Sequence, residues 1–218
     1  MKAGTNPLGG GTMGHYPELL RAMLMTSLML LPIAAAVAGP LEDADAAFES
    51  RDYPTTLQML HPLADQGDAT AQYILGRMYL DGNGVSQNYA EAVKWFRLSA
   101  DRGDADAQNS IGTMYEHGLG LPQNYAEAVK WYRKAADQRD PTAQYNLGAL
   151  YGLGHGVSQN DAEALKWLRL AANQGEAHAQ YGVGRAYFLG MVVSQNYVET
   201  VKWFPSLRTR ETVTPSST

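Results

Sequence analysis

The sequence predicts an all-α fold, a solenoid of stacked antiparallel helix pairs, and three observations support this prediction. A tryptophan recurs every 36 residues, at Trp95, Trp131, Trp167 and Trp203. A glycine keeps the same step, at Gly76, Gly112, Gly148 and Gly184. Within one period, apolar residues follow helical spacing twice, with a glycine-rich turn between the two stretches. A fixed period of this length indicates repeated units, each of which buries its apolar face against its neighbours.

The N-terminal residues 1–38 are predicted to be a signal peptide and not part of the fold. Ala22–Ala38 is apolar and uncharged, Arg21 precedes it, and its small-residue end is typical of cleavage before Gly39. The alternative is an uncleaved membrane anchor, although the stretch is shorter than the roughly 20 residues of a spanning helix. The true start could also be Met13 or Met23. We therefore expect a periplasmic or secreted protein.

The repeats divide the rest of the chain. Residues 39–67 are expected to be a degenerate opening half-repeat. Three full units follow at 68–103, 104–139 and 140–175, then a truncated unit at 176–204 and a disordered tail at 205–218.

The first unit shows why each period should hold two helices. Asp68 is a plausible N-cap for a first helix, helix A, which Gly82 would end because glycine accepts a positive φ. Asn88 would begin the second helix, helix B, and Glu91 three residues later completes a variant of the capping box. Gly103 closes the unit.

Glycine in the middle of helix A needs a compensation. Gly76 and its equivalents weaken the helix by about 1 kcal/mol each relative to alanine. We expect close approach of a neighbouring helix to offset this cost, beneath the tryptophan ring. The repeated tryptophans and tyrosines are accordingly assigned to packing and not to a cofactor site.

These motifs resemble the Sel-one-like repeat family, relatives of the tetratricopeptide repeats. The resemblance rests on A-x-x-x-[LIV]-G-x-x-Y, then G-x-G-[VL], then E-A-[VL]-K-W-x-x-x-A-A, and it covers Asp68–Phe204. It implies a right-handed superhelix of helix pairs. It also implies a protein-interaction scaffold, in a family whose many secreted bacterial members have no individual function assigned.

Comparison of the four copies with one another suggests where a partner would bind. Positions that vary among the copies follow one face of helix A, at spacings of three and four. In tetratricopeptide-like stacks this helix lines the concave groove, and aromatic and Arg side chains dominate binding hot spots. Ordinary surface variation is the alternative. The candidate residues, which we call the helix A row, are Tyr73, Arg77, Asn109, Thr113, Tyr145, His178, Tyr181 and Arg185.

Composition and motifs argue against several other functions. The net charge of −5 and the lack of a basic run do not support nucleic-acid binding, and no cysteine is present. His117 and His155 flank the glycine-rich turns without a metal-ligand pattern, and no nucleophile motif occurs. We expect no cofactor, no metal and no catalysis. A hydrolase acting on cell-wall or β-lactam substrates, as associated with cysteine-rich members of the resembled family, is the alternative.

The fourth unit departs from the pattern. Pro205 stands where the other units continue helix B, so that helix should end after about two turns. Val192 replaces a turn glycine and Thr200 replaces an alanine. Either this open end binds another molecule, including a second copy stacked end to end, or the unit is a decaying copy in a truncated or frame-shifted product. We favour the second. The partner is expected to be a protein or peptide, or else a cell-wall fragment.

Overall fold

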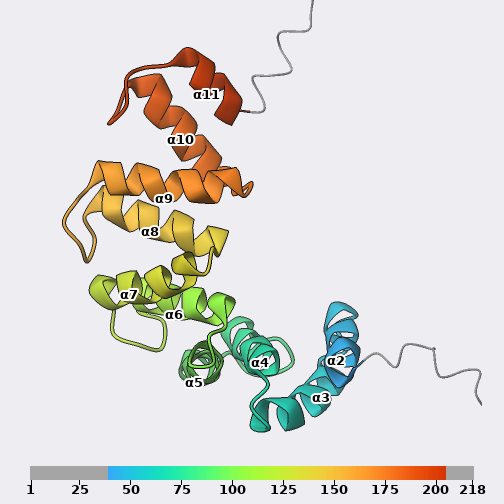
Figure 1. The fold of residues 1–218 in the computed structure, drawn as a ribbon. Coiled ribbons are helices and arrows are strands. Elements are labelled where there is room, and N and C mark those ends of the chain that lie inside the picture. Colours follow the sequence, from blue (N-terminus) through green and yellow to red (C-terminus); the bar gives the residue numbers. More distant parts are fainter. Residues whose placement is uncertain (1–38, 205–218) are drawn as a thin grey trace, which may run out of the picture. The chain divides into compact units, whose positions relative to one another are not determined.

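The computed structural model describes residues 39–204, and in this range it consists of ten helices with no strand (Figure 1). The predicted signal segment and the predicted tail, residues 1–38 and 205–218, lie outside the described residues. The helices are α2 (Pro40–Glu49), α3 (Tyr53–Asp65), α4 (Ala69–Asp81), α5 (Tyr89–Ala100), α6 (Ala105–His117), α7 (Tyr125–Asp137), α8 (Pro141–Leu153), α9 (Asp161–Asn173), α10 (Ala177–Leu189) and α11 (Tyr197–Trp203). Each packs on the next in chain order, which confirms the all-α repeat solenoid. None of these described helices is long and apolar enough to cross a membrane.

Helix A of the four units is α4, α6, α8 and α10, and its ends are those the sequence predicts. The side chain of Asp68 accepts a hydrogen bond from the Ala71 N–H at 2.8 Å, and Gly82 ends the helix at a φ of 76°. Asp104, Asp140 and Glu176 cap the other three helices, and Gly118, Gly154 and Gly190 end them. A short acidic side chain and a left-handed glycine thus set the length of every helix A.

Helix B is α5, α7, α9 and α11, and an asparagine side chain caps each of them, as predicted. The reciprocal half of the capping box is wrong, however. The Asn88 N–H donates instead to the Tyr79 carbonyl at 2.8 Å, and Glu91 pairs with Lys94. The same backbone bond recurs at Asn124, Asn160 and Asn196. This bond ties the start of helix B to the last turn of helix A, so no amide remains for the glutamate.

The glycine within helix A lies against an aromatic ring, but not the tryptophan ring. A Cβ placed on Gly76 would lie 2.5 Å from the Phe96 ring, and one on Gly112 would lie 2.6 Å from the Tyr132 ring. The expectation of close approach is confirmed, and the position beneath tryptophan is wrong. The ring belongs to the residue after the tryptophan, which points back at helix A of its own unit. Trp95 is half-buried and packs on the cluster that contains Leu75.

Side-chain hydrogen bonds join successive units. The Gln108 amide donates to the Ala100 carbonyl at 3.2 Å and accepts from the Gln138 amide at 2.9 Å. Gln144 repeats this with the Ala136 carbonyl at 3.2 Å and the Gln174 amide at 2.8 Å, and the Gln180 amide donates to the Ala172 carbonyl at 3.3 Å. We call these contacts the glutamine ladder. On another edge, the Arg97 guanidinium donates to the Tyr115 hydroxyl at 3.0 Å. The bonds from Gln108 to Ala100 and from Arg97 to Tyr115 link helix B of one unit to helix A of the next, whereas the glutamine–glutamine bonds lie within a unit.

The two ends of the described chain differ. The expected opening half-repeat holds two helices, α2 and α3, and its Ala44 and Leu60 share a buried cluster with Leu75 and Met78 of unit 1. At the other end α11 stops at Trp203, ahead of Pro205, which confirms the predicted early end of helix B.

Candidate functional site

The eight residues of the helix A row fall into two groups of four. Arg77, His178, Tyr181 and Arg185 are exposed. Three of these four lie on α10, and Tyr181 is 59% exposed. The accessible part of the row is therefore concentrated in unit 4.

The other four residues are half-buried and have partners within the protein. The Tyr73 ring lies 5.9 Å from the Phe96 ring, and burial together with the Asp106 carboxylate raises the pKa of Tyr73. Asn109 accepts a hydrogen bond from the Asn146 amide at 3.1 Å. These side chains contribute to packing between helices, so only their edges are open to a partner.

Thr113 belongs to a small polar cluster centred on Tyr132. The Tyr132 hydroxyl donates to the Glu116 carboxylate at 2.6 Å and lies 3.1 Å from the Thr113 hydroxyl. Burial, and then the bond to Glu116, raises the pKa of Tyr132 far above its ordinary value. The hydroxyl therefore remains a hydrogen-bond donor at any physiological pH, and the cluster is an internal contact of unit 2.

Tyr145 and His178 meet across the junction between units 3 and 4. Their ring centroids are 5.6 Å apart, and the His178 Nδ1 lies 3.0 Å from a Glu176 carboxylate oxygen. Burial opposes ionisation of Glu176, but the hydrogen bonds from the Ala179 N–H and from His178 outweigh it and lower the pKa. The cap of α10 therefore keeps its negative charge.

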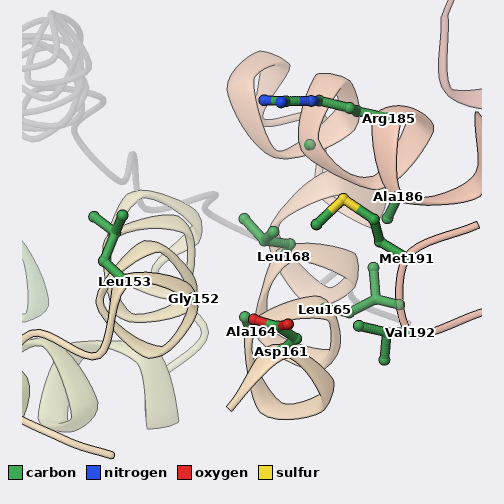
Figure 2. Close-up of a pocket in the computed structure, with 11 residues that line it drawn as sticks. Gly152, Leu153, Asp161, Ala164, Leu165, Leu168, Arg185, Ala186, Met191 and Val192 are labelled. Atoms are coloured by element: carbon green, nitrogen blue, oxygen red, sulfur yellow. The ribbon is translucent and has the colours of Figure 1, made fainter. Parts of the chain in front are cut away.

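An open hollow of about 350 Å³ lies beside α10, between units 3 and 4 (Figure 2). Its lining is mainly apolar, with one cation and one anion. The lining residues are Gly152, Leu153, Asp161, Ala164, Leu165, Leu168, Gly182, Arg185, Ala186, Met191 and Val192. We call it the junction hollow. Of the sequence candidates only Arg185 lies here. Comparison of the four copies could have revealed the hollow itself, because Gly152 and Gly182 stand where the other units have larger residues.

A second hollow of about 430 Å³ lies at the far side of α10, and we call it the end hollow. It is lined by Tyr181, Arg185, Phe188, Leu189, Thr200 and Phe204. Two sequence candidates, Tyr181 and Arg185, are brought together here. In unit 1 the equivalent residues Tyr73 and Leu80 pack on the cluster that contains Ile111 of unit 2. The end hollow is thus the face on which a following unit would pack.

The described residues show no grouping suited to metal chemistry. Within residues 39–204 no three His, Asp or Glu side chains gather where they could hold an ion. The His155 ring stacks on the Tyr125 ring at 4.5 Å, and His117 is exposed at the end of α6. Neither histidine has an acidic partner among the described ion pairs.

The repeat also identifies the family. Four tandem copies of the Sel1 repeat match residues 69–104, 105–140, 141–176 and 177–204. A comparison with curated proteins gave no match. Proteins with Sel1 repeats are usually protein-interaction scaffolds, and related scaffolds are generally non-catalytic.

Solved structures agree with this assignment. A protective antigen of uropathogenic Escherichia coli strains with an SLR fold is 42% identical with a TM-score of 0.67, over 71% of this chain and 33% of its own. A Sel1 repeat protein from Oxalobacter formigenes is 33% identical with a TM-score of 0.70, over 77% of this chain and 69% of its own. A sel1 repeat protein from Klebsiella pneumoniae, at 18% identity and a TM-score of 0.53 over 81% and 89%, shares the fold. This chain spans only about a third of the length of the first. The chain belongs to the Sel1 repeat family.

Proposed function

We propose that this protein is an interaction scaffold that binds a protein or peptide through the helix A row, chiefly through its unit 4 part. One observation carries the proposal. Four residues of the row, Arg77, His178, Tyr181 and Arg185, remain exposed, whereas the other four are half-buried. Binding hot spots are rich in Tyr and Arg side chains, and here such side chains lie exposed beside apolar surface.

Binding is proposed to take place outside the cytoplasm. The apolar segment Ala22–Ala38 and its small-residue end support export, so the partner is sought in the periplasm or outside the cell. A partner that is a protein or peptide fits the row better than a cell-wall glycan, because both hollows beside it have mainly apolar linings.

The test compares two variants with equal numbers of substitutions. The row variant carries His178→Ala, Tyr181→Ala and Arg185→Ala. The control carries Lys94→Ala, Lys130→Ala and Lys166→Ala on exposed positions of helix B. Each protein is immobilised and exposed to a cell-envelope fraction, and retained proteins are quantified by mass spectrometry.

We expect the wild type and the helix B control to retain the same one or few proteins, and the row variant to lose them. Circular dichroism and thermal melting confirm that all three proteins are folded. Retention of the same proteins by the row variant would refute binding through this surface.

A second candidate is self-association through unit 4, and the exposed apolar residues of that unit favour it. They are Tyr181, Phe188, Leu189, Met191, Val192, Tyr197 and Val198, each at least 49% exposed. At roughly 100 Å² for each half-exposed aromatic ring, these side chains together expose several hundred Å², the size at which apolar surface often marks an interaction site. Light scattering should show a mass that rises with concentration, and Phe188→Glu should abolish the rise. A constant monomer mass would exclude this candidate.

A further inference from the structure

The junction between units 3 and 4 departs from the repeat, and the departures line one hollow. Each departure replaces what the other units hold at the same position of the 36-residue period. Two are glycines: Gly152 replaces Leu80, Glu116 and Phe188, and Gly182 replaces Ile74, Ser110 and Asn146. Two replace aromatic residues: Asp161 stands for Tyr89, Tyr125 and Tyr197, and Leu168 stands for Phe96, Tyr132 and Phe204. The fifth, Val192, replaces the turn glycines Gly84, Gly120 and Gly156. All five line the junction hollow.

Two of the five are glycines that the fold does not need. A Cβ placed on Gly152 would lie 3.6 Å from the Ala164 Cβ, and one on Gly182 would lie 3.4 Å from a Leu168 methyl, both ordinary contacts. Neither glycine has a positive φ. Both lie inside helices, where glycine is destabilising. What they do in the structure is leave space, since any larger side chain would enter the hollow.

The other departures enlarge the same space. Leu168 brings no ring over its helix A, whereas Phe96 and Tyr132 do so in units 1 and 2. In unit 2, the turn glycine Gly120 lies so close to Tyr89 that a Cβ would come within 2.6 Å of its carbonyl oxygen. In unit 4 the equivalent residue is Val192, and it adopts a φ of 64° despite its β-branched side chain. A strained turn is thus kept at the rim of the hollow.

Arg185 lies between the two hollows and lines both of them. With 3.6 residues per turn, it falls between the side of α10 that carries Gly182 and Ala186 and the side that carries Tyr181 and Phe188. Within residues 39–204 its guanidinium has no ion pair and no hydrogen bond to another side chain. Asp161 lies at the opposite end of the junction hollow in Figure 2. A bound carboxylate is therefore attracted to one end and repelled from the other.

The spacing of these features suits an extended peptide that crosses α10. Alternate side chains of an extended chain point to the same face, about 6.6 Å apart, so residues i and i+4 are about 13 Å apart. An α-helix with its side chains is about 10–12 Å wide. Residues i and i+4 can therefore enter the two hollows while residue i+2 faces Arg185. The end hollow suits apolar side chains, because the residues equivalent to Tyr181 and Phe188 in unit 1, Tyr73 and Leu80, pack on the apolar cluster that contains Ile111.

We propose that α10 binds an extended peptide in which an acidic residue is flanked, two positions away on each side, by large apolar residues. The acidic side chain pairs with Arg185, one apolar side chain fills the junction hollow, and the other fills the end hollow. This inference rests on the proposed function, since it names the partner chemistry for the unit 4 part of the helix A row.

The experiment uses a short fluorescein-labelled peptide with the central sequence leucine–serine–glutamate–serine–phenylalanine, titrated with the full chain in fluorescence anisotropy. Replacing the glutamate by lysine should weaken binding at least tenfold. Arg185→Gln should cost about tenfold, or roughly 1.4 kcal/mol, and should reduce the dependence on salt. Arg139→Gln removes the same charge from an exposed position outside the row and should leave the affinity unchanged.

A second pair of variants tests the junction hollow. Gly182→Ile installs the residue that unit 1 carries at this position, and we expect at least tenfold weaker binding with an equal or higher melting temperature. Gly182→Ala strengthens the helix in the same way but leaves most of the space, so binding should stay within about twofold.

Three results would overturn the proposal: no binding of the glutamate peptide, equal binding of the lysine peptide, or full affinity in Gly182→Ile. If any of these occurs while capture from the envelope still depends on His178, Tyr181 and Arg185, the proposed function stands and only this peptide chemistry fails. A mass that doubles with concentration while the peptide does not bind would assign the surface to a second copy and also overturn it.

Discussion

The junction between units 1 and 2 and the junction between units 3 and 4 use the same helices of the same repeat, but different side chains fill them. At the first, Tyr73 and Leu80 pack on the Ile111 cluster, and the Phe96 ring covers Gly76. At the second, Leu168 takes the place of the ring, and a hollow of about 350 Å³ remains beside Gly182.

The difference shows which residues set the spacing of units and which set the surface between them. The caps of helix A and the backbone bond from Asn160 to Tyr151 are the same in unit 3 as elsewhere. The side chains that differ lie between those fixed points. A repeat protein can therefore change one junction without changing its period, because hydrogen bonds and caps define the period while side-chain volume defines the surface.

The largest expected effect compares the two residues that face the helix A glycine. Phe96 is fully buried, so Phe96→Ala should lower the free energy of unfolding by about 3–5 kcal/mol. Leu168 is half-buried at the edge of the junction hollow, and Leu168→Ala should cost only about 1–2 kcal/mol. Urea denaturation measures both. Equal losses would mean that the second junction is packed as tightly as the first.

The next comparison replaces two glycines by alanine, and we expect the stability to fall in one variant and to rise in the other. In Gly112→Ala the new methyl would lie 2.6 Å from the Tyr132 ring, so overpacking should cost about 1–2 kcal/mol in spite of the better helix former. In Gly152→Ala the nearest atom is 3.6 Å away, and stability should rise by about 0.5–1 kcal/mol. If both variants are destabilised, Gly152 has a packing role that its contacts do not reveal.

A smaller effect is expected at the turn of unit 4. Val192 has a φ of 64°, whereas glycine holds the equivalent position in the other units. Val192→Gly should raise stability by up to about 1 kcal/mol, because relief of the left-handed conformation exceeds the entropy that glycine loses. Val192→Asn should give part of this gain, since asparagine tolerates that conformation. The melting temperatures of the wild type and the two variants rank their stabilities. A glycine variant less stable than the wild type would show that the Val192 conformation is not strained.

The smallest effect concerns the caps of helix A and depends on pH. Burial raises the pKa of Asp104, against the hydrogen bond from the Ala107 N–H, whereas the pKa of Glu176 is lowered. The folded state therefore favours the protonated form of Asp104, and this group's contribution to stability falls as pH rises from 3.8 through the folded pKa. The contribution of Glu176 is present above 4.5 and is lost as pH falls through its lower folded pKa.

At pH 7, Asp104→Asn should be neutral because asparagine caps a helix as well as aspartate, and Glu176→Gln should cost a few tenths of a kcal/mol. Melting at pH 7 and near pH 4 separates the two, since the loss in Glu176→Gln should shrink in acid. A loss that does not change with pH would show that shape, and not charge, makes Glu176 a cap.

The sequence predicts the fold well because every determinant of a helix end is local. Asp68, Gly82 and Asn88 are recognisable by residue type and position, and the structure confirms all three as caps. The bond from the Asn88 N–H to Glu91 and the ring over Gly76 are predicted wrongly, because the Tyr79 carbonyl that accepts from Asn88 and the Phe96 ring are brought close only by the folding of the unit. The same holds for the site: Arg185 was a sequence candidate, but the hollows beside it come from volumes that meet across a junction.

The glutamine ladder has a consequence for how such a protein diversifies. Across the junction between units 3 and 4 the Gln180 amide donates to the Ala172 carbonyl at 3.3 Å, as the Gln144 amide does to the Ala136 carbonyl at 3.2 Å across the preceding one. One edge of each junction is thus held by a polar contact that is indifferent to the volume of side chains at the opposite edge. Evolution can enlarge or refill a single pocket by point substitution, and the neighbouring units neither shift register nor need compensating changes.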